Sequence, residues 1–235
     1  YLNVGTIALI DYSGSIGGGG FGSFTIGNLP PGMTATLVND TANSSIDLNI
    51  TSAAGLKWTG AASGDWDYST VNWVDGSGTP TTFNDGYLTK FLDDASTGII
   101  NITGFPTPST ILVSNSVLPY VWSGGALTVS SLVKKGAGSL TRIDGEADLI
   151  DQIELDQGML VISNTYDASF TTPLIDDGSS QGTFVKMGLS TLTASVANPT
   201  YDGAFLIAEG TLKPTVAQWF GTTNGSTIIT NGGTF

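Results

Sequence analysis

Carboxylates are the main acid–base groups of this chain, whose 235 residues include 20 Asp and Glu but no His and no Cys. Ser-His-Asp and Cys-His sites are therefore excluded, as are metal sites built from His and Cys. A carboxylate-pair enzyme that cleaves polysaccharides remains conceivable, with Asp93-Asp94 and Asp176-Asp177 as candidates. Neighbouring residues of a strand point to opposite faces, so we interpret both pairs as solvated turns. We predict that the chain is not an enzyme and has no cofactor.

Two further motifs match binding sites by letter only. The run Asp65–Ser69 begins like a Ca²⁺-binding loop, but Thr70 and Gly76 stand where such a loop needs Gly and Glu. The run Gly17–Gly22 spells the dinucleotide fingerprint Gly-x-Gly-x-x-Gly, but β-like residues follow it instead of a helix. We predict a capped turn at the first run, a flexible hairpin turn at the second, and no metal site.

Four aromatic residues lie close together among Gly and Asp: Trp58, Trp66, Tyr68 and Trp73. Exposed rings beside carboxylates and amides can stack on sugar rings, so this block could be the glycan-contacting surface of a carbohydrate-binding or adhesive module. The alternative is packing, in which the rings cover the core or plug a corner of the fold. Both interpretations remain open at the level of sequence.

The charge balance restricts the class of partner. The net charge is −13, and the only basic cluster is Lys134-Lys135. Nucleic acid and anionic membrane surfaces would be repelled. No stretch approaches the roughly 18 apolar residues of a membrane-spanning helix, and we expect no signal peptide in these residues. Both ends read as cuts from a longer chain.

The composition predicts many short strands. Charged residues make up 11% of the chain, against about 25% in an ordinary soluble domain, and 32 residues are Gly. Thr suits strands, while Ser, Asn and Gly suit the turns between them. The run Ile46–Ile50 shows the expected alternation of apolar and polar residues. One or two helical turns are expected at Thr215–Phe220, after Pro214, and a strand within Glu146–Asp156.

Internal repetition is the strongest signal. Leu132–Gly136 recurs as Phe184–Gly188, and the same displacement relates Gly158–Leu160 to Gly210–Leu212. Gly210–Leu212 recurs in turn as Gly233–Phe235, at about half that displacement. Units of about 23 to 26 residues, doubled to about 52, are the lengths of one solenoid coil and of a pair of coils. We therefore predict stacked coils in which equivalent segments of the two longer repeats are layers of one column. The predicted core residues are Ile153, Leu155, Leu160, Phe205, Ile207 and Leu212.

These repeats resemble the autotransporter-associated β-strand repeat of large bacterial surface proteins. The first copy carries the Lys-x-Gly-x-Gly-x-Leu-Thr strand within Leu132–Thr141 and the Gly-x-Leu strand within Ile153–Leu160. The second copy adds the Asn–Tyr–Gly turn at Asn198–Gly203. The first copy departs from that turn, and the second has Leu189-Ser190 where the family shows x-Gly.

The residues before the repeats also fit this resemblance. The Trp-rich block from Trp58 to Trp122 is similar to a segment that often precedes such repeats, and Ala8–Gly32 looks like the tail of a preceding unit. We therefore divide the chain into a strand-rich block at 1–55, a Trp/Gly-rich β block at 56–131 and β-helix repeats at 132–235, with double coils at 132–183 and 184–235.

The resemblance implies a right-handed parallel β-helix, export to the bacterial cell surface, and a structural role as adhesin, passenger or fibre. It implies no catalytic residues. The expected partners are other copies of the chain, neighbouring repeats of the same polypeptide, or a glycan, host or abiotic surface. We also expect the N-terminal block to form a separate antiparallel or irregular sheet.

Overall fold

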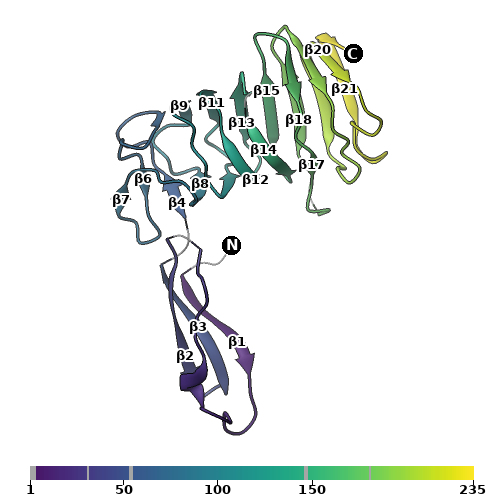
Figure 1. Ribbon diagram of the computed structural model, residues 1–235. Coiled ribbons are helices and arrows are strands. Elements are labelled where there is room, and N and C mark those ends of the chain that lie inside the picture. The colour runs from purple at the N-terminus through teal and green to yellow at the C-terminus, as the bar shows by residue number, and fades with distance from the viewer. Residues whose placement is uncertain (1–3, 31, 53–54, 146–147, 180) are drawn as a thin grey trace.

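The computed structural model describes residues 4–30, 32–52, 55–145, 148–179 and 181–235 (Figure 1). The described residues form 21 strands and one three-residue 3-10 helix, η1 (Phe21–Ser23), and contain no α-helix. No helix in this part of the chain is long and apolar enough to cross a membrane. The helical turns predicted at Thr215–Phe220 are wrong. Gln218 has φ +59°, which an α-helix does not allow, and the segment forms only turns.

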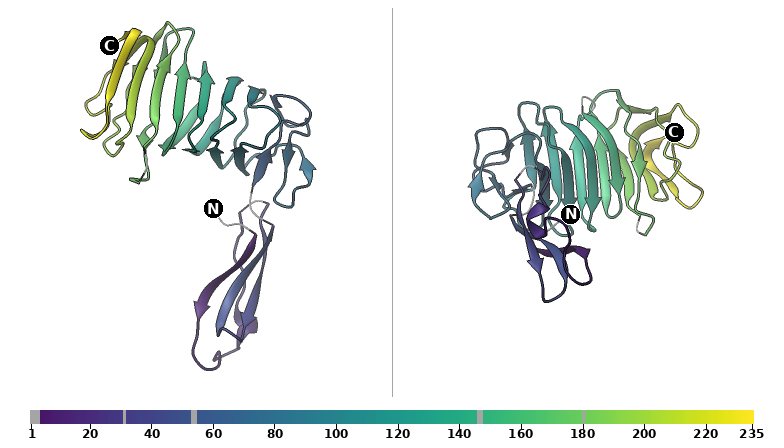
Figure 2. Two further views of the ribbon diagram at one scale, coloured as in Figure 1. Left: turned by 180° about the vertical axis from the view of Figure 1, so that it is seen from behind. Right: turned by 60° about the horizontal axis from the view of Figure 1, so that its bottom comes forward.

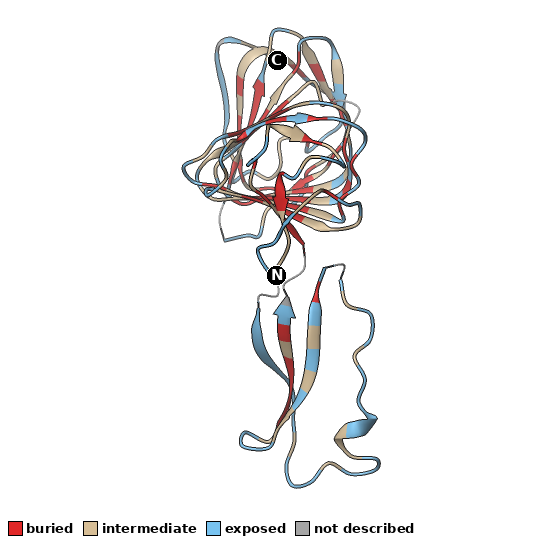
Figure 3. Cartoon of the chain, turned by 90° about the vertical axis from the view of Figure 1, so that its left-hand side faces the viewer, coloured by how far each residue is buried: buried red, intermediate tan, exposed pale blue. Residues whose placement is uncertain are grey.

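The N-terminal block is a three-stranded antiparallel sheet that projects from one end of the remaining structure (Figures 1 and 3). Its strands are β1 (Gly5–Asp11), β2 (Thr34–Asp40) and β3 (Ser45–Ser52), in the order β1-β3-β2. Met33, Leu48 and Ile50 form a small core of their own. The expectation of a separate antiparallel block is confirmed.

The remaining strands wind into a parallel β-solenoid of about seven turns, as the repeats predicted (Figures 1 and 2). One sheet, in the order β17-β14-β12-β10-β8-β4-β6-β7, forms what we call the first side. Its pairs are parallel except β4–β6 and β6–β7, which lie at the N-terminal end. Its strands are β4 (Leu56–Trp58), β6 (Trp73–Val74), β7 (Pro80–Thr81), β8 (Leu88–Leu92), β10 (Thr110–Ser114), β12 (Thr128–Lys135), β14 (Leu149–Leu155) and β17 (Leu174–Ile175).

The other sheet is entirely parallel and covers two sides. Within β20, Phe205–Ile207 pair with β18, whereas Thr211–Pro214 pair with β19. We call the ladder from β5 through β18 to the beginning of β20 and β21 the second side, and the ladder of β16, β19 and the end of β20 the third side. The strands are β5 (Asp65–Trp66), β9 (Ile99–Ile102), β11 (Tyr120–Gly124), β13 (Ser139–Ile143), β15 (Met159–Ser163), β16 (Ala168–Phe170), β18 (Thr183–Met187), β19 (Thr191–Ala194), β20 (Ala204–Pro214) and β21 (Thr227–Thr234).

Backbone register sets the length of a turn, and it corrects the predicted column of the two longer repeats. One turn takes the chain from Leu132 to its partner Ile153 on the first side, and from Leu160 to its partner Phe184 on the second. The equivalent residues Leu132 and Phe184 thus lie on different sides. The longer displacement is two turns plus one side, because the same corner motif is used at two different corners of the coil.

The shorter displacement, from Gly210–Leu212 to Gly233–Phe235, relates two layers that are directly stacked. Gly210 pairs with Gly233 and Thr211 with Thr234, as the shorter displacement predicted. Gly158 occupies the corresponding position at the other corner and has φ +70°. A Cβ on Gly158 would lie 2.2 Å from the Gly138 carbonyl oxygen, so only glycine fits there.

Alternation along each strand fills the interior. All six predicted core residues are buried, and Figure 3 shows the buried residues gathered inside the coil. On the second side Leu160, Phe184 and Phe205 stack in consecutive turns, and the rings of Phe184 and Phe205 lie 5.9 Å apart. Burial of each such side chain stabilises the fold by about 1.5–3 kcal/mol.

Candidate functional site

The three tryptophans of the aromatic block lie inside the protein, which confirms the packing interpretation and not the glycan-contacting one. Trp58, Trp66 and Trp73 are 0%, 0% and 1% exposed. Their rings pack edge to face, 5.2 Å apart for Trp58–Trp73 and 5.3 Å for Trp66–Trp73, around Phe83 and Phe91. Stacking of a sugar on these three indoles is therefore wrong for this structure. The rings instead form, with Phe83 and Phe91, an aromatic plug at the N-terminal end of the solenoid.

Tyr68 is the one member of that block that stays exposed. Its hydroxyl donates to Asp85 Oδ1 at 3.1 Å and to the Phe105 carbonyl at 3.1 Å. Partial burial and the hydrogen bond to Asp85 raise the pKa of Tyr68 to about 12. Because Trp58, Trp66 and Trp73 are buried, Tyr68 stands alone and the four-residue platform is not assembled.

The two Asp-Asp pairs serve as hydrogen-bond acceptors and do not converge. Asp93 accepts the backbone N–H groups of Ser116, Val117 and Leu118 in the next turn, at 2.9–3.0 Å. Asp94 instead pairs with Lys57 at 2.7 Å. The two carboxylates of the second pair also have separate partners. Asp176 accepts the N–H of Asp202 in the next turn, and Asp177 accepts the N–H of Ser179 in its own turn.

Capping of a neighbouring turn is a general use of aspartate in this solenoid. Six aspartates each accept a backbone N–H from a residue that lies 21 to 26 positions further along the chain, in the next turn. Corner residues leave the strand ladder, so their N–H groups need another acceptor. Much of the acidity of the chain is thus structural. The carboxylates are Asp85, Asp93, Asp144, Asp156, Asp167 and Asp176.

Substitution of Asp93 by Asn should weaken the pH dependence of the stability of the folded protein below about pH 4. Hydrogen bonds from Leu118, Val117 and Ser116 lower the pKa of Asp93 below 3.8. Its contribution is therefore present above about pH 4 and lost as the pH falls through the lowered value. We expect Asp93→Asn to lower the melting temperature by a few degrees at pH 7 and much less near pH 2. Thermal unfolding by circular dichroism at the two pH values measures this. An equal deficit at both would contradict it, and Asp94→Asn, which alters only an exposed ion pair, is the control.

Two buried lysines occupy equivalent places at two different corners. Lys134 and Lys186 are both fully buried. Lys134 Nζ donates to the carbonyls of Lys135 and Gly136 at 2.8 Å and of Gln157 at 3.3 Å. Lys186 repeats this pattern with the carbonyls at 187, 188 and 209. The ammonium thus satisfies carbonyls that the corner turns away from the ladder. The Lys-x-Gly spacing in both repeats was a signal for this role that the sequence analysis left unused.

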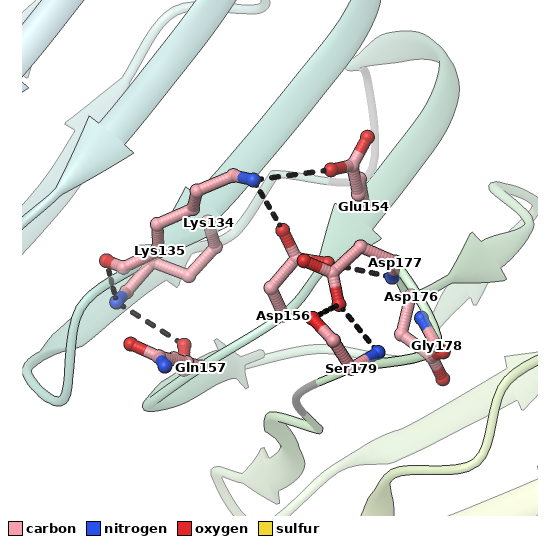
Figure 4. A network of polar contacts seen from close by, with 9 residues as sticks. All are labelled: Lys134, Lys135, Glu154, Asp156, Gln157, Asp176, Asp177, Gly178 and Ser179. Atoms are coloured by element: carbon pink, nitrogen blue, oxygen red, sulfur yellow. Dashed lines mark hydrogen bonds and ion pairs between the residues drawn. The ribbon is translucent and has the colours of Figure 1, made fainter.

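A group of three charged side chains lies on the outer face of the first side (Figure 4). Lys135 Nζ is 2.9 Å from Asp156 Oδ2 and 3.6 Å from Glu154 Oε1, and Asp156 Oδ1 accepts the N–H of Asp177. Burial and the hydrogen bond to Asp156 raise the pKa of Glu154. Glu154 and Asp156 are therefore the carboxylates that converge, which their i, i+2 spacing on one strand face could have indicated.

Two convergent carboxylates whose pKa values differ are the arrangement that acid–base hydrolysis needs. Here, however, Lys135 lies against both groups, and the side chain of Asp156 is only 2% exposed. A cavity of about 50 Å³ lies elsewhere, inside the coil beside the ion pair of Arg142 and Asp148. A space of this size holds a few water molecules, not a sugar ring. The geometry favours a structural ion-pair network.

The remaining motifs also form local structure. Asp67 accepts the N–H groups of Ser69 and Thr70 at 2.7 and 2.6 Å, which is a capped turn. Among the described residues no group of three or more Asp and Glu side chains is placed to hold a metal ion. Within Gly17–Gly22 the Gly20 N–H bonds to the Gly17 carbonyl and η1 follows, so the fingerprint is not followed by a helix that could bind a pyrophosphate.

The two ends of the solenoid differ. The N-terminal end is closed by the tryptophan plug, whereas the last strand, β21, pairs only with β20 among the described residues. Ile229 belongs to the inward column of Lys186 and Ile207, yet it is 49% exposed. Comparisons with protein-family models, curated proteins and solved structures find no match to this chain.

Proposed function

We propose that this chain is a non-catalytic structural segment of a secreted bacterial surface or fibre-forming repeat protein, where it acts as a stiff spacer. The observation that carries the proposal is the unbroken ladder of the second side, which connects β5 to β21 through every turn. Each turn is bonded to the next along its strands and at its corners. Bending or stretching such a column would break several hydrogen bonds at once.

The use of the charged groups supports a structural role. The converging carboxylates are occupied by Lys135 and a backbone N–H, the capping aspartates by the next turn, and the buried lysines by corner carbonyls. An active site would hold such groups toward an open cavity. Placement at the cell surface rests on the resemblance to the autotransporter-associated repeat and is compatible with the absence of Cys.

Lengthening the column by whole turns tests the spacer role. Thr183 pairs with Ala204, so residues 183–203 are one turn and can be duplicated after residue 203. Three added copies should lengthen the particle by about 14 Å, at about 4.8 Å per strand. Small-angle X-ray scattering measures the length, and limited proteolysis shows whether the added turns are folded. The control carries Phe184→Asp in each copy, and we expect its insert to be cleaved without gain in length.

Two outcomes would overturn the proposal. One is an intact, unlengthened core with the wild-type copies cleaved as a loop. The other is release of new chain ends from uronate-containing or neutral glycans by the wild-type protein, abolished by Glu154→Gln. The second result would assign a polysaccharide-cleaving activity to the carboxylates of the first side.

A further inference from the structure

The outer face of the second side is uncharged from β9 to the beginning of β21, whereas β5, at its N-terminal end, carries Asp65. Its central column begins at Ile99, passes through Val161, Val185 and Leu206, and ends at Ile228, and each member pairs with the next turn. From β9 to the beginning of β21, the charged residues on this side are Arg142 and Lys186, and both are buried and inward-facing. The strands run in a single parallel row (Figures 1 and 2).

This face is also partly apolar and accessible. Met159 and Met187 are 42% and 36% exposed, and Ile228 is 52% exposed. Val161 and Val185, which they flank, are only 6% and 3% exposed. The accessible apolar surface therefore lies at the methionines and toward the end of the column.

The first side presents the opposite character, with Lys90, Lys135 and Glu154 on its outer face. The contrast between the two sides is a property of the whole row of strands and not of one residue. In a chain whose net charge is −13, a charge-free outer face of this length is a candidate interaction surface.

We infer that the occupant of this face is a second copy of the chain, packed face to face in a two-fold arrangement. Two copies with a net charge of −13 repel each other through their acidic surfaces, whereas the second side brings no charge against itself. Contact between identical faces is isologous and closes as a dimer. The plugged N-terminal end disfavours stacking of copies head to tail, so lateral pairing is the arrangement that the described surface fits best.

The size of the face predicts a weak dimer. Seven strands at about 4.8 Å give a length of roughly 34 Å, and five residues at about 3.3 Å give a width of roughly 17 Å. Two such faces bury on the order of 1,100 Å² in total, at the lower limit of specific interfaces. We expect a dissociation constant on the order of 10 µM. This inference rests on the proposed rod, because lateral pairing needs a straight and regular side, and it specifies the partner of that rod.

Sedimentation equilibrium of the full chain between about 1 and 200 µM tests the inference. The wild-type protein should be a monomer–dimer equilibrium. Met159→Glu with Met187→Glu should raise the dissociation constant at least tenfold by placing like charges across the interface. The control, Thr110→Glu with Gln152→Glu, adds the same charge to the outer face of the first side and should leave the equilibrium unchanged.

A distance measurement checks the orientation of the pair. The chain has no Cys, so Thr183→Cys gives one spin label on the second side and Gln152→Cys one on the first. Labels at 183 should be close across the dimer, because packed sheets lie about 10 Å apart, and labels at 152 should be far apart.

Three results would overturn the inference. These are a monomer at every concentration, a dimer that survives both glutamates, and a dimer that is lost on Ile229→Asp but not on Met159→Glu with Met187→Glu. The last would place the contact at the open end of the solenoid. The spacer proposal is judged separately, because a monomeric chain that lengthens by whole turns keeps that role and loses only this partner.

Discussion

Replacing Phe184 by Asp should unfold the solenoid. Phe184 is fully buried between Leu160 and Phe205, and its ring lies 5.1 Å from Phe170 and 5.5 Å from Trp219. The substitution removes these contacts and buries a carboxylate without a partner, a combination that costs more than about 4–5 kcal/mol. Urea unfolding followed by far-ultraviolet circular dichroism measures the loss, and at 37 °C the variant should lack the β spectrum.

Met187→Asp is the matched control in the same strand. Met187 is three residues further on and points outward, where a carboxylate remains hydrated, so we expect a change within about 0.5 kcal/mol. We expect Leu155→Asp and Ile207→Asp to lose an amount of stability between those of Met187→Asp and Phe184→Asp. The reason is that Leu155 pairs with Lys134, and Ile207 pairs with Lys186. An ammonium beside the new carboxylate should make these losses smaller than that of Phe184→Asp. Equal stability of Phe184→Asp and wild type would refute the stacked core.

Lys134→Met should cost about 2–4 kcal/mol, although methionine has a similar length and is more apolar. Lys134 Nζ donates three hydrogen bonds to carbonyls at the corner, and methionine removes all three, although the Lys135 carbonyl still accepts the N–H of Asn115. An unsatisfied buried acceptor costs about 1–3 kcal/mol, which outweighs the relief of burying one charge fewer. Lys57→Met, which removes a partly exposed ion pair with Asp94, should cost less than about 1 kcal/mol.

The pH dependence of the same variant distinguishes this account from simple loss of packing. Burial lowers the pKa of Lys134 to about 8 from 10.5. Between those values the unfolded chain binds more protons than the folded one, so the contribution of Lys134 to stability becomes more favourable as the pH rises from 8 to 10.5. Lys134→Met should lack that increment. The urea midpoints of wild type and variant at pH 7 and pH 10 measure it, and parallel pH profiles would count against a charged, buried Lys134.

The interior of the solenoid and the outer faces of its two sides carry different kinds of side chain. The interior is apolar, with lysines at the corners of the repeats. The outer face of the first side holds the ion pairs of Figure 4, and that of the second side holds none among the described residues. The capping aspartates sit between turns. Most of the charged groups named above are engaged in structural contacts, so they support a catalytic function poorly. The regular solenoid supports a function that depends on length and lateral contact.

The sequence alone determined the class of fold and the contents of the core. Alternation along strands assigned the inward residues correctly, and Ile153, Leu160 and Leu212 are buried as predicted. The echo of Gly210 at Gly233 identified two layers in direct contact. Side-chain period and corner glycines are local properties, so a single sequence can reveal them.

Only the tertiary structure decided which segments are neighbours and which side chains face solvent. The repeats that begin at Leu132 and Phe184 use the same corner motif on different sides, because hydrogen-bond register, not sequence similarity, fixes the length of a turn. The tryptophans of the N-terminal end became a plug and not a surface, because an aromatic ring among Gly and Asp is compatible with either role until the end of the coil is closed. The convergence of Glu154 with Lys135 depends on strands that lie far apart in sequence, and so does the uncharged outer face from β9 to β21. Local pattern carries no information about their pairing.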